Sequence, residues 1–488
     1  MSGLATGHGP TGDVEIVTGW GRNPSSAAHV VRPTDADELA VATKAAGPRG
    51  AIARGLGRAY GDSAMNAGGL VVSSTGVSGL LELDHTRGTA RVLAGTSLDS
   101  LLRVIVPQGW FVPVTPGTRH ITVGGAIAAD VHGKDHHATG SFGAHVQSLV
   151  LGLPDGTRRT LTPGPKHTAR SHGRSDRGSG EPVQDADEFW ATCGGMGLTG
   201  TVVEATIRLH AIETSLLRVD TDRVPDLDTL LRLLSEGGRR HRYSVAWVDF
   251  LARGQSLGRS VLIQGDFARR DELPGAGRRG SRHRERDPLA YSPMRPVPAP
   301  RIVPTGVLNK GSILAFNELW YRLHPRRRRD ELQSISRFFY PLDLVDGWNR
   351  MYGPRGFLQW QCLLPFGAEE VLRHIVEALA DHRAPSFLAV LKYFGAADPA
   401  PLSFAGPGWT LALDVPTTDT TLAPLLDRLD ERVAEAGGRL YLAKDSRLRP
   451  ELLPVMYPRL DEWRALRDRL DPDRRLNSDL ARRLDLLG

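Results

Sequence analysis

The residues of this 488-residue chain that could do chemistry are a few cations in apolar or glycine-rich sequence. Only six of the 61 basic residues are lysines, so a retained lysine either marks a place where a compact ammonium is needed or reflects compositional drift. Lys392 follows the apolar run 387–391 and shares a strand face with Leu388 and Val390. A desolvated amine there would have a lowered pKa and could accept a proton. The alternative is a salt-bridged strand lysine.

Other polar side chains stand in similarly marked places. His132 lies between glycine-rich backbone and Lys134, where an imidazole could relay a proton or simply be structural. Gln359 and Gln361 share a strand face and could bind hydroxyl groups or pair in the core. Lys444 could hold an anionic group, or it is a turn lysine beside an aspartate.

A metal centre is not predicted. His136 and His137 are adjacent, but no carboxylate or cysteine stands at ligand spacing. The chain has two cysteines, Cys193 and Cys362, which are far apart and fit buried thiols.

Two glycine-rich segments, 53–63 and 116–128, could hold phosphate, because successive backbone amides in tight turns form a concave anion site. A further segment, 195–200, matches the spacing of a dinucleotide fingerprint. The first segment lacks the third glycine of a dinucleotide fingerprint, where Tyr60 stands instead, and the last follows a predicted helix and precedes a strand. A nicotinamide-binding Rossmann domain is therefore not expected.

The elements that must position these residues alternate along the chain. We predict helices at 97–106, 187–192, 369–380 and 422–436, and short strands at 51–54, 69–72, 90–93 and 202–207. Strand-like runs at 243–250, 356–364 and 386–394 should form one antiparallel sheet. This pattern predicts an α+β fold.

The excess positive charge is concentrated in two segments and is not spread along the chain. The formal net charge is +6, and the excess lies in an arginine-rich stretch within 268–300 and in a block at 326–329. We expect both to be solvated loops, with a further inserted loop at about 163–184. Because no stacking aromatics are interleaved with these arginines, a nucleic-acid-binding protein is the weaker alternative. Neither a signal peptide nor a membrane-spanning run is visible.

The glycine segments taken together resemble a known superfamily. Arg-Gly-x-Gly-Arg-x-Tyr-Gly-Asp at 54–62, Thr-Val-Gly-Gly-Ala-Ile-Ala at 122–128 and Gly-Gly-x-Gly-Leu-Thr-Gly at 194–200 are similar to the FAD-binding domain of vanillyl-alcohol oxidase-like enzymes. The resemblance implies a two-domain fold of the PCMH type, with an antiparallel-sheet substrate domain. Arg58 stands where relatives carry a histidine covalently linked to flavin, so noncovalent FAD is implied.

More specific strings resemble one family within that superfamily, the polyprenylphosphoryl-ribose 2′-oxidases of actinobacterial cell-wall synthesis. They include Val-His-Gly-Lys at 131–134, Gly-Phe-Leu-Gln-Trp-Gln at 356–361 and Asp-Ser-Arg at 445–447. The resemblance implies oxidation of the ribose 2′-hydroxyl of decaprenylphosphoryl-β-D-ribose to a 2′-keto sugar. It also implies a short-chain-dehydrogenase-type reductase as partner and peripheral contact with either face of the plasma membrane.

The resemblance also assigns residues. For catalysis it implies Lys392, His132, Lys444 and Tyr60. For flavin contact it implies Ala53, Arg54, Gly55, Leu56, Gly57, Arg58, Ala59, Tyr60, Gly61, Asp62, Ser63, Gly117, Thr122, Val123, Gly124, Gly125, Ala129, Asp130, Val131, His132, Val202 and Tyr441. For substrate contact it implies Trp247, Gln359, Gln361, Val390, Lys392, Thr410, Ala412 and Lys444. Two of these depart from the mycobacterial pattern, which has asparagine at Thr410 and cysteine at Ala412.

The domain organisation expected from the resemblance has three parts. Residues 1–213 form the FAD-binding domain, 214–438 the substrate domain, and 439–488 a segment that returns to the FAD-binding domain. An alternative within enzymes is a soluble sugar or alditol oxidase of the same superfamily.

Overall fold

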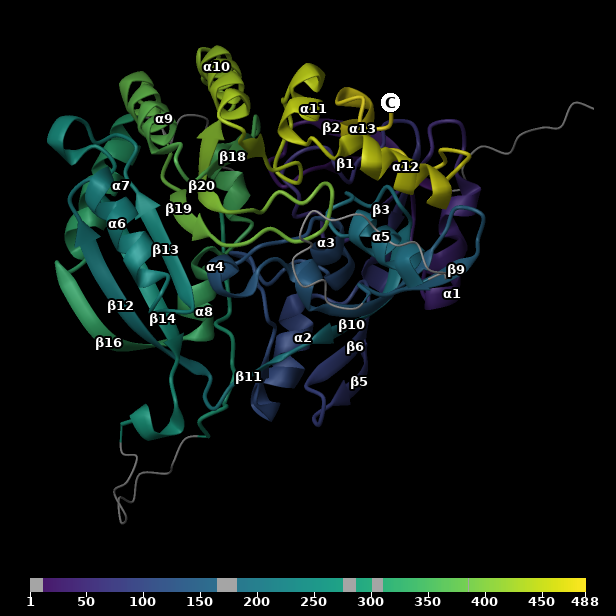
Figure 1. Ribbon diagram of the computed structural model, residues 1–488, viewed down its shortest axis with the longest axis horizontal. Helices are drawn as coiled ribbons and strands as arrows, with labels where there is room; N and C mark the ends of the chain where they lie inside the picture. The colour runs from purple at the N-terminus through teal and green to yellow at the C-terminus, as the bar shows by residue number, and fades with distance from the viewer. Residues whose placement is uncertain (1–11, 165–181, 275–286, 301–309, 385) are drawn as a thin grey trace, which may run out of the picture.

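The computed structural model describes residues 12–164, 182–274, 287–300, 310–384 and 386–488. Figure 1 shows two bodies side by side, with the C-terminal helices lying over the N-terminal body. Helices and antiparallel sheets alternate along the chain, which confirms the predicted α+β class. Among the described residues no helix combines the length and apolar character that crossing a membrane requires.

The N-terminal body contains two sheets. The first has the strand order β1 (Asp13–Thr18), β2 (Ser25–Val31), β4 (Leu70–Ser73), β3 (Ala51–Arg54), with β3 parallel to β4. The second is antiparallel, in the order β5 (Leu80–Asp84), β6 (Thr89–Leu93), β10 (Thr201–Arg208), β8 (Val146–Gly152), β9 (Arg158–Leu161). Strand β3 runs directly into the first glycine segment, so a rigid sheet carries that loop.

This body has five described helices. They are α1 (Ala36–Val41), α2 (Leu98–Ile105), α3 (Val123–Ala128), α4 (His136–Thr139) and α5 (Pro182–Thr192). Of these, α1, α2 and α3 begin at side-chain caps. The Ser97 hydroxyl caps α2 by accepting from the Ser100 amide at 3.0 Å. Leucines and isoleucine at 98, 101, 102 and 105 are buried, which is the spacing of one helix face. The fingerprint-like segment 195–200 lies between α5 and β10, so the helix-then-strand order predicted for it is confirmed.

The second body is built on an eight-stranded antiparallel sheet. Its order is β16 (Arg327–Ser334), β12 (Leu216–Val224), β14 (Ser260–Phe267), β13 (Tyr243–Val248), β19 (Ala389–Phe394), β20 (Gly408–Pro416), β18 (Phe357–Pro365), β21 (Arg439–Leu440). The three predicted strands β13, β18 and β19 therefore do share one sheet. The helices of this body are α6 (Leu227–Gly237), α7 (Lys310–Leu323), α8 (Ile335–Phe339), α9 (Glu369–His382) and α10 (Leu422–Glu435).

Alternation along the central strands separates a core face from a polar face. Trp360, Cys362 and Leu364 of β18 are buried in the same apolar core as the leucines of α9 and α10. Trp360 also donates its indole N–H to Asp430 of α10 at 2.8 Å. Gln359 and Gln361 must then point the other way, because successive strand residues face opposite sides.

The C-terminal segment contacts the first glycine loop. It contains α11 (Leu453–Met456), α12 (Leu460–Leu470) and α13 (Asp479–Arg483). The Arg483 guanidinium donates to both Asp62 oxygens, at 2.8 and 2.9 Å, and to Asp445 at 2.8 Å. A Cβ at Gly61 would lie 1.7 Å from the Asp445 carbonyl oxygen, so only glycine allows this approach.

Two loop predictions need correction. The described parts of 268–300 are not structureless: Ser215 donates to the Ala290 carbonyl at 2.7 Å, and β15 (Val297–Pro298) pairs with β17 (Val345–Asp346). The arginine block is not a loop either, because Arg327–Ser334 form β16, an edge strand paired with β12. Arginine is tolerated there because an edge strand leaves side chains in water. The inserted loop at 163–184 lies largely outside the described residues.

Candidate active site

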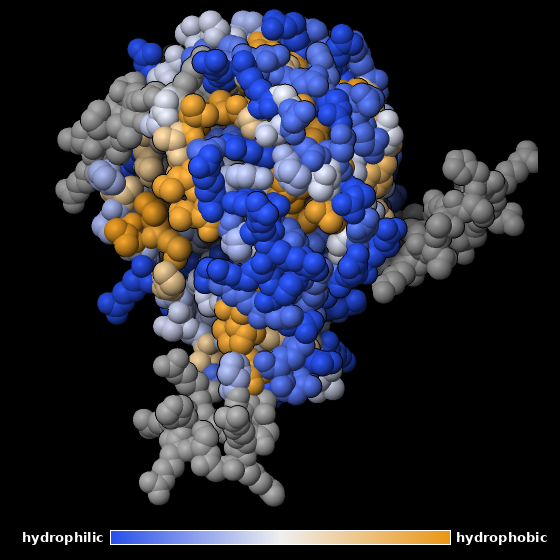
Figure 2. Space-filling model, turned by 90° about the vertical axis from the view of Figure 1, so that its left-hand side faces the viewer, coloured by the Kyte–Doolittle hydropathy of each residue, from blue (hydrophilic) through white to orange (hydrophobic). Residues whose placement is uncertain are grey.

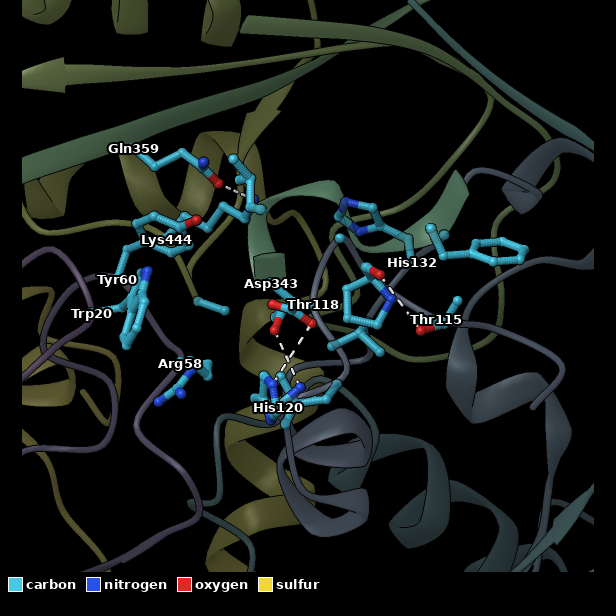
Figure 3. Close-up of a pocket in the computed structure, with 18 of the residues that line it drawn as sticks. Trp20, Arg58, Tyr60, Thr115, Thr118, His120, His132, Asp343, Gln359 and Lys444 are labelled. Atoms are coloured by element: carbon cyan, nitrogen blue, oxygen red, sulfur yellow. Dashed lines mark hydrogen bonds and ion pairs between the residues drawn. The ribbon is translucent and has the colours of Figure 1, made fainter. Parts of the chain in front are cut away.

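A cavity of about 760 Å³ lies between the glycine-rich loops and the polar face of the eight-stranded sheet. This volume falls within the range of about 300–1,000 Å³ that is usual for ligand sites. Figure 3 shows Lys444 reaching toward Gln359 beside Tyr60, with His132 across the space from them. Most residues assigned by the resemblance line this one cavity.

One wall of the cavity is backbone. No amide from Gly55 to Ala59 donates to an acceptor in the described part of the chain. Gly117 lines the opposite loop, and a Cβ built on it would meet no protein atom within 4 Å. Five successive free donors beside reserved space are what a diphosphate requires.

Side chains hold this wall in place. The Arg54 guanidinium donates to the carbonyls of Thr18 at 2.6 Å and Ala64 at 3.0 Å. The Thr122 hydroxyl caps α3 by accepting from the Gly125 amide at 3.1 Å. The Arg58 guanidinium lies 4.1 Å from the centre of the Trp20 ring, so a cation rather than an imidazole occupies this position.

Five assigned residues are not brought to the cavity. Gly61 and Asp62 serve the contact with the C-terminal segment, and Val123 is in the apolar core. Asp130 is buried and accepts from the Gly143 amide at 2.9 Å and the Ser403 hydroxyl at 2.6 Å. Thr410 lies behind Gln361.

The other wall is a row of side chains from four neighbouring strands. Trp247 of β13 is paired with Val390 of β19, Val390 with Ala412 of β20, and Ala412 with Gln361 of β18. All four line the cavity. Strand register therefore places four assigned substrate residues in one line, although 165 positions separate Trp247 from Ala412 in the chain.

Lys392 lies two residues beyond this row on β19, on the same face. No carboxylate in the described ranges lies within ion-pair distance of it, so the salt-bridged alternative is wrong. Burial lowers the pKa of its ammonium to about 8, although Asp135 opposes the shift. At pH 7 about a tenth of this amine is thus neutral and able to accept a proton, and the fraction rises with pH.

Lys444 belongs to a buried polar chain that ends at Asp414. The Lys444 ammonium donates to the Gln359 side-chain carbonyl, and the Gln359 amide donates to Asp414. Burial and nearby Lys392 lower the pKa of Lys444 to about 7. Burial also raises the pKa of Asp414 to about 7. Lys444 does lie in a turn beside Asp445, as the alternative had it, but Asp445 pairs with Arg483 and the Lys444 ammonium contacts Gln359.

His132 closes the cavity between the two walls. The Gln361 amide donates to His132 Nε2 at 3.0 Å and to the Thr410 hydroxyl at 2.9 Å. Since Nε2 accepts, the neutral ring carries its proton on Nδ1, a buried atom with no partner among the described residues. Burial, followed by the charges of Lys392 and Lys444, depresses the pKa of His132 well below its usual value.

Several residues in the cavity or directly behind its lining were missed by sequence reasoning. Asp414 is directly opposite Gln359 in the sheet, and the signal for it was an acid inside an apolar strand. Lys134 belongs to the motif Val-His-Gly-Lys at 131–134, but the resemblance assigned it no role. In the structure its ammonium donates to the Phe338 carbonyl, and burial lowers its pKa to about 7. Trp20 carried no signal, since only the fold brings it under Arg58.

The histidine pair beside the cavity makes contacts with neighbouring protein groups. His136 accepts from the Gly395 amide at 3.2 Å and packs on Phe394 at 4.2 Å. No group of three or more potential ligands occurs in the ranges that the structure describes.

Comparison with known proteins agrees with this geometry. Residues 27–162 match the family model for an FAD binding domain, and residues 368–484 match that for D-arabinono-1,4-lactone oxidase. The free amides of 55–59 and the open space at Gly117 suit the group that the first match implies. The protein is an FAD-binding oxidoreductase with the two-domain α+β fold of vanillyl-alcohol oxidase-like enzymes.

Full-length relatives define the family further. The chain is 42% identical over 474 residues, 96% of its length and 97% of the relative's, to decaprenylphosphoryl-beta-D-ribose oxidase of Mycolicibacterium smegmatis. It is 40% identical over 80% of its length to an uncharacterized protein of Streptomyces coelicolor, all of which is covered. An alditol oxidase of a Streptomyces species is 30% identical over 30% of this chain and 36% of its own. The chain belongs to the decaprenylphosphoryl-β-D-ribose oxidase family.

Proposed function

We propose that this chain oxidises the ribose 2′-hydroxyl of decaprenylphosphoryl-β-D-ribose to a 2′-keto sugar. The alcohol loses a hydride from C2′ and a proton from its oxygen. FAD, when bound, supplies the hydride acceptor. The observation that carries the proposal is the meeting of Lys392, an amine without a carboxylate partner in the described chain, with His132 at one end of the cavity.

Each polar residue of the sheet wall then has a distinct task. Lys392 takes the hydroxyl proton, because its lowered pKa leaves a neutral amine available. Gln361 fixes the orientation of His132 by donating to Nε2, so the proton of the neutral ring is on Nδ1. Lys444, buried beside Tyr60, offers positive charge to an anionic oxygen. Trp247 and Val390 provide an apolar floor under the sugar.

Noncovalent attachment of FAD is part of the proposal. Arg58 cannot form the linkage that a histidine could, and its guanidinium is held by the Leu56 carbonyl at 2.7 Å and by Trp20. The purified protein should be yellow, and acid precipitation should release all of its flavin. Flavin retained in the washed pellet would contradict this.

Substrate identity is tested by anaerobic bleaching of the flavin. Farnesylphosphoryl ribose should bleach the holoenzyme, and free alditols should not. The alternative function, oxidation of free alditols, is supported by the partial similarity to an alditol oxidase. Bleaching by alditols alone would replace the proposed substrate with a free sugar alcohol.

The proposed partners follow from the product and the substrate. A 2′-keto sugar must be reduced to complete an epimerisation, so a short-chain-dehydrogenase-type reductase is the expected second enzyme. With an added electron acceptor that reoxidises the flavin, the keto sugar should accumulate when the reductase is left out; with the reductase and NADH the arabinose epimer should form. The lipid substrate also implies peripheral contact with a membrane.

A further inference from the structure

Helix α7 presents two different faces. Ile313 and Asn317 are fully buried against the sheet, and Tyr321 donates its hydroxyl to the Val224 carbonyl at 3.2 Å. These residues, spaced by four, form one stripe. Asn317 also donates to Asp249 at 2.7 Å, so the orientation of the helix is determined.

The neighbouring stripe of α7 is apolar and open. Phe316, Leu319, Trp320 and Leu323 follow the spacing of a single helix face. They are 39%, 59%, 37% and 70% exposed. Large apolar side chains gathered on one exposed face indicate a contact with something apolar.

Unpaired positive charge adjoins this stripe. Arg326 and Arg327 are exposed at the start of β16, and neither has an ion-pair partner among the described residues. The nearby acids are already engaged, since Glu318 pairs with Arg259 and Arg322, and Glu331 with Arg328. Figure 2 looks onto the side that carries α7 and β16 and shows hydrophobic side chains gathered beside a band of hydrophilic ones.

The apolar stripe continues into the cavity. Trp320 and Leu323 line both the exposed face and the cavity. The Trp320 ring contacts that of Trp247, on the sheet wall, with centroids 6.5 Å apart, and stacks on Phe316 at 5.9 Å. An aromatic path therefore leads from the sugar site to the outer surface of α7.

We infer that α7 and the adjoining arginines dock on an anionic phospholipid surface, with the mouth of the cavity held at the lipid. Leucine and aromatic side chains beside arginine are the composition of helices that lie in a membrane interface. This deepens the proposed function, on which it rests for the substrate. A cavity of about 760 Å³ that also takes FAD leaves no room for a decaprenyl tail, so the tail leaves along the aromatic path.

The test uses the full-length holoenzyme and vesicles of phosphatidylcholine with or without phosphatidylglycerol. The protein should float with the anionic vesicles. Leu319→Glu should weaken this binding by about tenfold or more, because a leucine side chain that would enter the lipid is lost and a charge of the wrong sign is added. Val455→Glu is the matched control, since Val455 is 57% exposed on α11, and it should bind as the unaltered protein does.

The arginines are tested separately. Arg326→Glu combined with Arg327→Glu should reduce binding to the anionic vesicles by about tenfold or more. Arg87→Glu with Arg432→Glu changes the net charge equally at sites 82% and 60% exposed elsewhere, and should have little effect. Equal losses in the two double variants would overturn the assignment to this surface.

Two further readouts separate this inference from the proposed function. Farnesylphosphoryl ribose, a short-tailed substrate in solution, should bleach the flavin of Leu319→Glu as fast as that of Val455→Glu. Turnover of vesicle-borne decaprenyl substrate by Leu319→Glu should be slower than that by the control. Binding by Leu319→Glu equal to that of Val455→Glu would overturn the docking surface and leave the activity untouched. A dimer that becomes monomeric in Leu319→Glu would also overturn it, by making the stripe a contact between copies.

Discussion

The two walls of the cavity work by different physics. The loop wall offers backbone amides at 55–59 and open space at Gly117, with Arg54 and Thr122 serving as supports. The sheet wall offers side chains, and burial has lowered the pKa of Lys392 on this wall and of Lys444 in the turn beside it. Cofactor binding and proton chemistry are therefore separable, because backbone donors do not titrate and buried amines do.

The largest effect predicted from the difference between the two walls is at Lys392, on the sheet wall. Lys392→Ala should keep its FAD but slow flavin reduction by polyprenylphosphoryl ribose by about 10²–10⁴-fold, the usual contribution of a positioned base. Stopped-flow absorbance of the flavin under anaerobic conditions measures this. Lys44→Ala, in the N-terminal body, is the matched control. Reduction at the unaltered rate would remove Lys392 from the mechanism.

The pH profile of the same step sharpens the assignment. With a pKa of about 8 in the folded protein, Lys392 is neutral above that pH and protonated below it. The rate of flavin reduction should therefore rise with pH through about 8, and this rise should be absent in Lys392→Ala. A rise that persists in the variant would assign the titration to another group, such as Lys444.

The loop wall is tested at Gly117, where the effect should fall on cofactor affinity. Gly117→Val places side-chain atoms in space that the fold leaves open, so FAD binding should weaken by at least tenfold. The melting temperature of the apoprotein should stay the same, because no protein atom is displaced. Gly406→Val is the control, as a Cβ there meets atoms only at 3.7 Å or more. Full FAD content in Gly117→Val would contradict the predicted diphosphate position.

The smallest effect is expected behind the sheet wall, at Thr410. Thr410→Val removes a donor to the Cys362 carbonyl at 2.9 Å and an acceptor for Gln361. The free energy of unfolding should fall by about 1 kcal/mol, and flavin reduction should change only a few-fold. Urea titration measures the first, with Thr86→Val in an exposed turn as control. A hundredfold loss of reduction would show that Thr410 contacts the reacting groups.

Local patterns allowed much of the fold to be predicted. Ser97 followed by an apolar helix stripe, and the alternation of Gln359 and Gln361, depend only on neighbours in the chain. Residues 326–329 were misjudged because charge density resembles a loop, whereas pairing with β12 makes Arg327–Ser334 a strand. Pairing partners distant in sequence leave no local signal.

The residues of the candidate site were predicted mainly from sequence motifs that resemble those of the family. Asp414 and Trp20, which lie outside these motifs, were missed. They became visible only when strands and loops were brought together. The same holds for the apolar stripe of α7, since its spacing would equally suit a helix buried in the core. Exposure is decided by what packs against a helix.

The sequence by itself determined the class of chemistry. Residue type alone carries this information. Glycine at 55, 57 and 117 allows tight turns with accessible amides, and a lysine in apolar surroundings has a lowered pKa. Tertiary structure alone decided that Lys392 is without a carboxylate partner in the described chain, that Gln359 joins Lys444 to Asp414, and that α7 opens the cavity to the surface. The physical reason is that pKa, pairing and exposure depend on neighbours in space, which strand register supplies.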